Sequence, residues 1–317
     1  MVKTLKPPKI PSAGGAFATP LRYPGGKGRL GPWLAQVLAY NQLEGGWYVE
    51  PFAGGAGAAL YLLVRHHVDH IVINDVDPVV YAFWRAVTEE TSSFINLMRS
   101  TPVNMRSWER QRAIVNSPLK HDFVQLGFAA FFLNRTNRSG ILSAGVIGGR
   151  AQSGTWKLDA RFNVERLVER VQRIGSLSKH ITVTGMDALD LLIDAAPGFP
   201  NNTLVYLDPP YFEKGSLLYR NHYEIDDHSD IASALKDARY PLIVTYDDCV
   251  EIRSIYHGFE STQFSIKYST THLARPKVNE MLFHRNIELP FAPAMTRGYD
   301  WKSGVVQTRA RAQHIVL

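Results

Sequence analysis

Short apolar, β-prone runs recur along the chain, and helical patterns lie between them. Each run is bounded by glycine, proline or acidic residues, which is typical of central strands in a parallel sheet. The runs cover residues 47–52, 70–75, 181–185, 204–207 and 241–246. Strands that alternate with helices predict an α/β fold with a Rossmann-like sheet.

The middle of the chain interrupts this alternation, because residues 91–175 are mostly helical in pattern. The helix predicted at 122–133 is apolar on most faces, so we expect it to be buried. Residues 141–156 favour a hairpin or a mobile loop, and the helix predicted at 161–174 is rich in arginine. The sequence therefore predicts a largely helical insertion within the α/β fold.

These patterns predict a discontinuous α/β domain. It is expected to comprise residues 19–90 and 176–290, with 91–175 as the insertion. The flanking residues, 1–18 and 291–317, are expected to be an arm and a tail.

Composition removes several classes of protein. The chain of 317 residues has a single cysteine, Cys249, which excludes an internal disulfide and fits a reducing compartment. No apolar run is long enough for a transmembrane helix, and Met1–Ala18 has no apolar core of a signal peptide, so we expect a cytoplasmic protein. The net charge of +6 is compatible with a polyanionic partner without demanding one.

The run that ends at residue 207 leads into Asp208-Pro209-Pro210-Tyr211. Neither proline can donate a hydrogen bond to the sheet, so strand pairing has to stop at Asp208. That places Asp208 at the carboxyl end of a strand, where open α/β sheets bind their ligands. A carboxylate, a proline carbonyl and the flat ring of Tyr211 suit a planar substrate that carries an amine. The alternative is a strand-end turn in which Asp208 caps and Tyr211 packs.

A second candidate site follows the strand at 47–52. Gly54 and Gly55 lie in a glycine turn before a predicted helix, and Asp75 ends the next strand about twenty residues later. A glycine turn, a helix N-terminus and an acid at this distance are typical of nucleotide-type sites, in which the acid binds ribose hydroxyls. His66, His67 and His70 lie close together in sequence, but no acidic partner completes a zinc motif, so we expect no metal.

The buried helix predicted at 122–133 leads into the polar residues Asn134, Arg135, Asn137, Arg138 and Ser139. Amides and guanidinium groups bind phosphates and purine edges, so this stretch is a candidate for contact with a nucleic acid. The alternative is a helix end that the asparagines cap.

Together these segments resemble the Dam-like N(6)-adenine-specific DNA methyltransferases. Asp208-Pro209-Pro210-Tyr211 matches the catalytic motif of that family, and Asn134-Arg135-Thr136 matches a segment that leads to a DNA-contacting hairpin. The resemblance extends over residues 20–285 and is weakest in the insertion. It implies an S-adenosylmethionine-dependent methyltransferase sheet with a DNA-recognition insertion.

The resemblance also assigns roles to single residues. Asp208, Pro209 and Tyr211 are expected to be catalytic, with Tyr211 stacking on a flipped base. The methyl donor is expected to meet Tyr23, Lys27, Phe52, Gly54, Gly55, Asp75, Asp187 and Asp208. In the family an aromatic residue, two glycines and a lysine close over the donor, which Tyr23, Gly25, Gly26 and Lys27 match.

The implied function is site-specific methylation of adenine in double-stranded DNA, with base flipping and without a metal. A restriction–modification role and the oligomeric state, monomer or weak dimer, are left open by the sequence. Other amino-methyltransferases, acting on cytosine, RNA or a protein glutamine, are the nearest alternatives, although the motifs of the cytosine and glutamine enzymes begin with serine and asparagine. An oxidoreductase would leave Asp208–Tyr211 and the arginine-rich insertion unexplained. A catalytically inactive relative is disfavoured because every motif position is filled.

Overall fold

The sheet at the centre of the molecule has seven strands in the order β3-β2-β1-β4-β5-β7-β6. The strands are β1 Trp47–Glu50, β2 His70–Asn74, β3 Ile181–Thr184, β4 Thr203–Leu207, β5 Leu242–Asp247, β6 Glu260–Lys267 and β7 Lys277–Arg285. Strands β1 to β5 pair in parallel, whereas β7 runs antiparallel to both β5 and β6. The predicted parallel strands are therefore confirmed, and an antiparallel pair closes the sheet at one edge.

The computed structural model describes residues 19–23, 26–212, 223–267, 277–293, 299–300 and 305–306. The predicted arm, Gly25 and much of the predicted tail lie outside these residues. Within the tail, β8 Tyr299–Asp300 pairs with β9 Val305–Val306 as a separate two-stranded sheet.

Both faces of the sheet are buried, and successive residues of a strand belong to different cores. Tyr48 of β1 belongs to one hydrophobic cluster and its neighbour Val49 to the other. In the same way, Leu204 and Tyr206 of β4 face the first cluster, whereas Val205 faces the second. This two-residue period follows from the pleat of the strand, and it explains why the strands read as continuous apolar runs.

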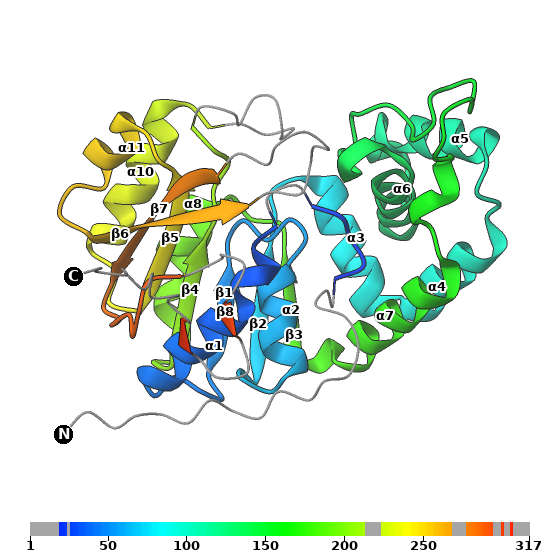
Figure 1. Cartoon of the computed structure of the whole chain (residues 1–317). Coiled ribbons are helices and arrows are strands. Elements are labelled where there is room, and N and C mark those ends of the chain that lie inside the picture. Colours follow the sequence, from blue (N-terminus) through cyan, green and yellow to red (C-terminus); the bar gives the residue numbers. More distant parts are fainter. Residues whose placement is uncertain are drawn as a thin grey trace, which may run out of the picture.

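Helices cover the two faces of the sheet (Figure 1). The first face carries α1 Gly31–Tyr40, α2 Gly57–Val64 and α3 Pro78–Glu89. The second face carries α8 Ala188–Asp190, α10 Ile225–Lys236 and α11 Val250–Ile255. The α/β prediction is therefore confirmed as a three-layer architecture.

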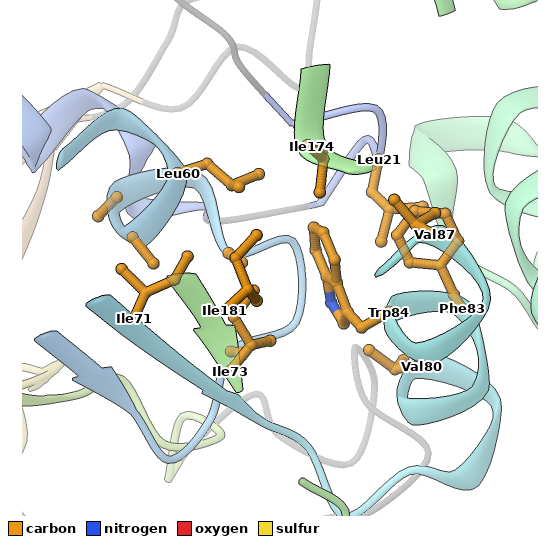
Figure 2. Packing of buried hydrophobic residues seen from close by; sticks show 14 of the residues in the cluster. Leu21, Leu60, Ile71, Ile73, Val80, Phe83, Trp84, Val87, Ile174 and Ile181 are labelled. Atoms are coloured by element: carbon orange, nitrogen blue, oxygen red, sulfur yellow. The ribbon is translucent and has the colours of Figure 1, made fainter. Parts of the chain in front are cut away.

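The middle of the chain folds into helices α4 Thr91–Ser100, α5 Met105–Val115, α6 Phe123–Thr136 and α7 Val164–Ser176, gathered beyond α3 (Figure 1). Trp84 of α3 joins these helices to the sheet. Figure 2 shows its indole among Ile73 and Ile181 of the strands and Ile174 of α7. One hydrophobic core thus continues from the sheet into the helical segment, and the division into two domains stays a prediction.

Two helices of this segment have other bounds than predicted, and of the two alternatives for residues 141–156 the hairpin does not form. Helix α6 continues to Thr136, so Asn134 and Arg135 lie in its last turn and not on a loop. Residues 141–156, all described, contain no strand; one isolated bridge joins Val146 to Asn137. Arg161 lies in a short 3-10 helix, and α7 begins only at Val164 because Asn163 caps it by accepting from the N–H of Arg166.

The strand order indicates the edge of the sheet at which a ligand would bind. Strand β1 connects outward through α2 to β2 on one side, while β4 and β5 lie on its other side. The carboxyl ends of β1 and β4 therefore flank the point at which the order reverses, which is where α/β sheets form their binding crevice. None of the helices in the described ranges is both long and apolar enough to cross a membrane.

Candidate active site

A cavity opens at the carboxyl ends of β1, β2 and β4. Four acidic residues line it: Glu50 at the end of β1, Asp75 and Asp77 after β2, and Asp208 after β4. The other lining residues that matter below are Tyr23, Lys27, Phe52, Gly54, Gly55, Asn134, Tyr206, Pro210 and Tyr223. Residues far apart in sequence thus meet at the edge that the strand order indicates.

Asp208 is held by one of its two carboxylate oxygens. Its Oδ1 accepts a hydrogen bond from the Thr245 hydroxyl at 2.9 Å and from the Lys27 ammonium at 2.7 Å. No hydrogen bond within the described residues reaches Oδ2, and the side chain keeps 21% of its surface exposed. Burial raises the pKa of Asp208, while Lys27 lowers it and Glu280 raises it further. One oxygen is fixed in place and the other is available to a ligand.

Lys27 begins a short 3-10 helix, and its side chain is buried beside the end of β4. Its Nζ also donates to the Tyr211 hydroxyl at 3.1 Å and lies 3.5 Å from Oε2 of Glu280. The Tyr211 hydroxyl in turn donates to Oε1 of Glu280 at 2.8 Å. The ammonium therefore acts on the Asp208 motif itself, and its contact with a methyl donor stays a prediction.

Tyr211 and Pro209 are less open than we expected. The Tyr211 residue is 9% exposed and its hydroxyl is anchored, so stacking on a base, which stays a prediction, would use the small uncovered part of the ring. Pro209 is buried, and no described hydrogen bond uses its carbonyl. That oxygen keeps the capacity to accept one hydrogen bond.

The glycine turn after β1 is shaped by Tyr23. Gly54 has a φ of +46°, and a Cβ placed there would lie 2.6 Å from the Tyr23 ring. A Cβ at Gly55 would lie 3.0 Å from Tyr23 Cβ. The Gly54 N–H donates to Oδ2 of Asp75 at 2.9 Å, and its carbonyl accepts from the Trp84 indole at 2.9 Å. The glycine turn, the Tyr23 ring and the Asp75 carboxyl group thus pack together as one unit.

Two of the acids that line the cavity hold protons unusually tightly. Burial raises the pKa of Asp75 to about 7, against two backbone N–H groups that lower it. Burial likewise raises the pKa of Glu50 to about 8. The Glu50 Oε1 accepts the N–H of Ala59 at 3.1 Å, so it occupies the N-terminus of α2. A dinucleotide pyrophosphate needs that helix end, and here a carboxyl group fills it.

Phe52 and Asp187 flank the cavity in different ways. Phe52 lines it and packs edge-on against Tyr223, with ring centroids 5.6 Å apart. Asp187 is exposed and caps α8 by accepting from the N–H of Leu189 at 2.8 Å. After burial as the main cause, its negative charge raises the pKa of Tyr223, so Asp187 lies near that lining residue without lining the cavity itself. Contact of Asp187 with a donor stays a prediction.

The polar stretch after α6 divides into buried and exposed residues. Asn134 is buried and brackets Arg22, because Oδ1 accepts the Arg22 N–H at 2.7 Å and Nδ2 donates to its carbonyl at 2.8 Å. Asn137 is also buried: it accepts from the Trp108 indole and donates to the carbonyls of residues 141 and 142. The expectation of DNA contact is corrected for both amides, because their hydrogen bonds are used inside the protein.

The arginines of this stretch also differ. Arg135 is largely covered and donates to the carbonyls of Arg161 and Pro20. Burial and the nearby arginines lower its pKa to about 9, which marks a costly position for a charge. This side chain positions the backbone, whereas Arg138 and Ser139 are exposed. Contact with DNA stays a prediction for these exposed residues.

Sequence reasoning missed three parts of the site. Thr245 lies within a predicted strand without an assigned role, and neither Glu280 nor Glu50 was assigned one. A polar residue inside an otherwise apolar strand was the available signal for Thr245 and Glu280. Asn74 gives the same signal. It donates to the carbonyls of Pro51 and Met186 and so ties the strand ends together.

Comparison with known proteins shows to which family the chain belongs. The model of the D12 class N6 adenine-specific DNA methyltransferases matches residues 23–271. The chain belongs to this family. The enzyme is thus a DNA adenine methyltransferase, and the matched range includes Lys27, Asp75 and Asp208 but ends before Glu280.

Two curated relatives carry the name type II methyltransferase. M.CviBI of Paramecium bursaria Chlorella virus NC1A is 23% identical over 229 residues, which is 70% of this chain and 80% of that protein. M.MjaIII of Methanocaldococcus jannaschii is 23% identical over 232 residues, which is 68% of this chain and 77% of that protein. Both similarities extend over most of the enzyme.

Solved structures are more distant. A protein of Pyrococcus horikoshii described as a putative RNA methyltransferase has a TM-score of 0.36 at 11% identity, covering 83% of this chain and 84% of its own. The methyltransferase described as putative, yhhF of Escherichia coli, has a TM-score of 0.32 at 11% identity, covering 82% and 87%. These TM-scores are too low to establish a shared fold, so the fold assignment rests on the strand order.

Proposed function

We propose that the enzyme transfers a methyl group from S-adenosylmethionine to the exocyclic amine of an adenine flipped out of duplex DNA. The observation that carries this proposal is the state of Asp208. Lys27 and Thr245 fix its Oδ1, while Oδ2 stays available at the cavity. A fixed carboxylate with one open oxygen suits an N–H donor of the base.

The chemistry of the lining favours a cationic donor. Glu50, Asp75 and Asp208 bring three carboxyl groups to the cavity, and Lys27 already bonds with one of them. S-adenosylmethionine supplies a transferable methyl group on a positively charged sulfonium. A dinucleotide would bring two negative phosphates to these acids and to a helix N-terminus that Glu50 already occupies. The residues therefore fit S-adenosylmethionine better than a nicotinamide cofactor.

The donor-binding roles follow from the same geometry. Tyr23 packs directly against Gly54 and Gly55, and all three line the cavity, so a ligand would lie against the surface that they form together. Asp75 holds the turn by its Oδ2 and faces the cavity, where a carboxylate binds ribose hydroxyls. Phe52 supplies an apolar wall, and Asp187, near Tyr223, is proposed to meet the adenine of the donor.

The Asp208 motif would activate and orient the target. The adenine amine is a weak nucleophile because its lone pair is delocalised into the ring. Oδ2 of Asp208 and the Pro209 carbonyl can each accept one of its N–H groups, which returns electron density to the nitrogen. Holding that nitrogen in line with the methyl group is catalysis by positioning. Base flipping is proposed because enzymes that modify a base in a duplex take it out of the stack, which costs about a few kcal/mol.

Recognition of a specific DNA site is proposed for the helical segment 91–175. Arg138 and Ser139 are exposed beside residues 140–143, which line the cavity, so a duplex that delivers a base there would pass close to both. Arginine read-out of guanine is the commonest specific contact to a base. The names of the two curated relatives support a restriction–modification setting.

One experiment tests the chemistry directly. Duplex DNA is incubated with the enzyme and S-adenosylmethionine, digested, and analysed for methylated nucleosides by mass spectrometry. We expect N(6)-methyladenine from the parent enzyme and almost none from Asp208→Asn, which keeps its size but loses its negative charge. Calorimetry with S-adenosylmethionine and with NAD is the control for folding and for the donor. Full turnover of Asp208→Asn, or binding of NAD alone, would contradict the proposal.

A further inference from the structure

A fully buried carboxyl group lies behind the proposed catalytic motif. Glu280, on β7, has no exposed surface, and its backbone pairs with Asp247 of β5 and Phe264 of β6. Its side chain accepts from the Tyr211 hydroxyl at 2.8 Å and lies 3.5 Å from the Lys27 ammonium. It therefore contacts Lys27, which supports Asp208, and Tyr211 of the same motif, without lining the cavity itself.

The charges in this group do not cancel. Lys27 brings one positive charge, whereas Asp208 and Glu280 bring one negative charge each when ionised. If Lys27 faced Asp208 alone, the ammonium would neutralise the carboxylate on which the amine depends. Glu280 shares the ammonium and leaves the group with a net negative charge. That charge matters because the target nitrogen becomes positive while the sulfonium loses its charge.

We propose that Glu280 is a positioning residue for adenine methylation, which holds Lys27 and Tyr211 and keeps the Asp208 group net negative as the amine attacks. The inference rests on the role of Asp208 stated under the proposed function. Glu280 touches neither the target base nor the donor, so it acts through Lys27 and Tyr211.

A purely packing role would not need this residue type. A neutral amide at the same position could accept the hydrogen bond of Tyr211, and burying a carboxylate without need is costly. The contact to Lys27 is the one that a charge improves. Glu280 also lies beyond the range that the family model matches, so no motif assigns it a role.

Several titratable groups surround Asp208 and bear on any pH readout. They are Lys27 before α1, Glu50 and Tyr48 of β1, Tyr206 of β4, Tyr211 after β4, and Glu280 of β7. Glu280 raises the pKa of Asp208 and Lys27 lowers it. Removing the charge of Glu280 should therefore lower the pKa of Asp208, and removing the charge of Lys27 should raise it.

The test compares Glu280→Gln, which removes only the charge, with Glu280→Asp, which keeps the charge and shortens the side chain. We expect single-turnover methylation at saturating donor and DNA to fall at least about tenfold in Glu280→Gln. Glu280→Asp should retain more activity than Glu280→Gln, and the KM for the donor should stay within about twofold in both. The acidic limb of the pH–rate profile should move to lower pH in Glu280→Gln, because Asp208 loses a negative neighbour.

The matched control is Glu260→Gln on β6, an exposed carboxylate outside the site, which should behave like the parent. A double variant tests the route: if Glu280 acts through the ammonium, Glu280→Gln should cost no further activity in a Lys27→Met background. Should Glu280→Gln fail to fold, Lys27→Met alone should move the acidic limb to higher pH, and an unmoved limb would overturn the inference.

Two further results would overturn it. One is a Glu280→Gln enzyme with parental rate and pH profile; the other is more activity in Glu280→Gln than in Glu280→Asp, which would indicate shape and not charge. Asp208→Asn measured alongside separates the two proposals. If that variant is inactive while Glu280→Gln is normal, only the role of Glu280 fails. If Asp208→Asn is fully active, the proposed function fails first.

Discussion

The Lys27 ammonium and the Asp208 carboxylate meet at 2.7 Å, although 181 residues separate them along the chain. The ammonium takes the same oxygen, Oδ1, that the Thr245 hydroxyl takes. This shared contact orients the carboxylate and leaves its second oxygen for a substrate. The first prediction concerns that orientation.

Thr245→Val should lower turnover by about tenfold, with donor affinity unchanged. The substitution removes one hydrogen bond to Asp208 and leaves the buried Tyr206 hydroxyl, 2.8 Å from Thr245 Oγ1, without its partner. Thr262→Val on β6, a strand farther from the site, is the matched control. Single-turnover methylation and donor calorimetry measure both quantities. An unchanged rate would mean that Lys27 alone orients Asp208.

Donor binding should release protons near neutral pH. The folded enzyme holds protons on Asp75, with a pKa of about 7, and on Glu50, with a pKa of about 8. A cationic ligand favours the ionised carboxylates and lowers both pKa values, so at pH 7 roughly one proton should leave per donor bound. Calorimetry in two buffers of different ionisation enthalpy gives the number. The release should be smaller in Glu50→Gln and should vanish at pH 9.5; proton uptake would contradict the assignment.

Gly54→Ala should abolish donor binding while the chain stays folded. The added Cβ would lie 2.6 Å from the Tyr23 ring, and the φ of +46° costs a non-glycine residue about 1–2 kcal/mol. Gly198→Ala is the matched control, since a Cβ there meets nothing within 4 Å and φ is ordinary. Urea unfolding separates strain from loss of the site. Donor affinity equal to that of the control would show that Tyr23 can move aside freely.

Arg135→Ala and Arg138→Ala should differ in kind. Arg135 supports the backbone of Pro20 and Arg161, so its loss should lower the free energy of unfolding by about 1–3 kcal/mol. Arg138 is exposed, so its loss should spare stability and weaken DNA methylation. If Arg138 contacts a phosphate, the salt slope of binding should fall by about one unit for every sequence; if it reads guanine, one base position should lose about 1–3 kcal/mol of discrimination. Parental DNA methylation by Arg138→Ala would place recognition elsewhere.

Local chemistry made part of this site predictable. Two prolines after an apolar run end β4 at Leu207, and that alone places Asp208 at the edge of the sheet. The glycines and Asp75 were predictable for a similar reason, because a turn and a strand end fix both within one βαβ unit. The alternation of apolar and polar residues was sufficient to predict the parallel strands.

Contacts across the sheet were not predictable in this way. Glu280 reaches Tyr211 only because β7 pairs with β5, and the two residues are 69 positions apart. Asn137 looked like a surface residue, yet the Trp108 indole and two carbonyls bury it. Polar side chains in a sequence do not reveal whether their hydrogen bonds go to a ligand or to the protein itself.

The separation of Lys27 from Glu280 has a consequence for synthesis of the enzyme. The Lys27 ammonium lies before α1, whereas Glu280, one of its two carboxylate neighbours, lies on β7. The chain therefore has to be synthesised as far as β7 before this charge arrangement is complete. A chain still emerging from the ribosome can pair β1, β2, β3 and β4 and carry Asp208, yet it lacks the strand that completes the charge arrangement. Methylation activity should therefore appear as a late event of folding, after β7 has inserted between β5 and β6. Incomplete chains should therefore not methylate DNA while they are still being synthesised.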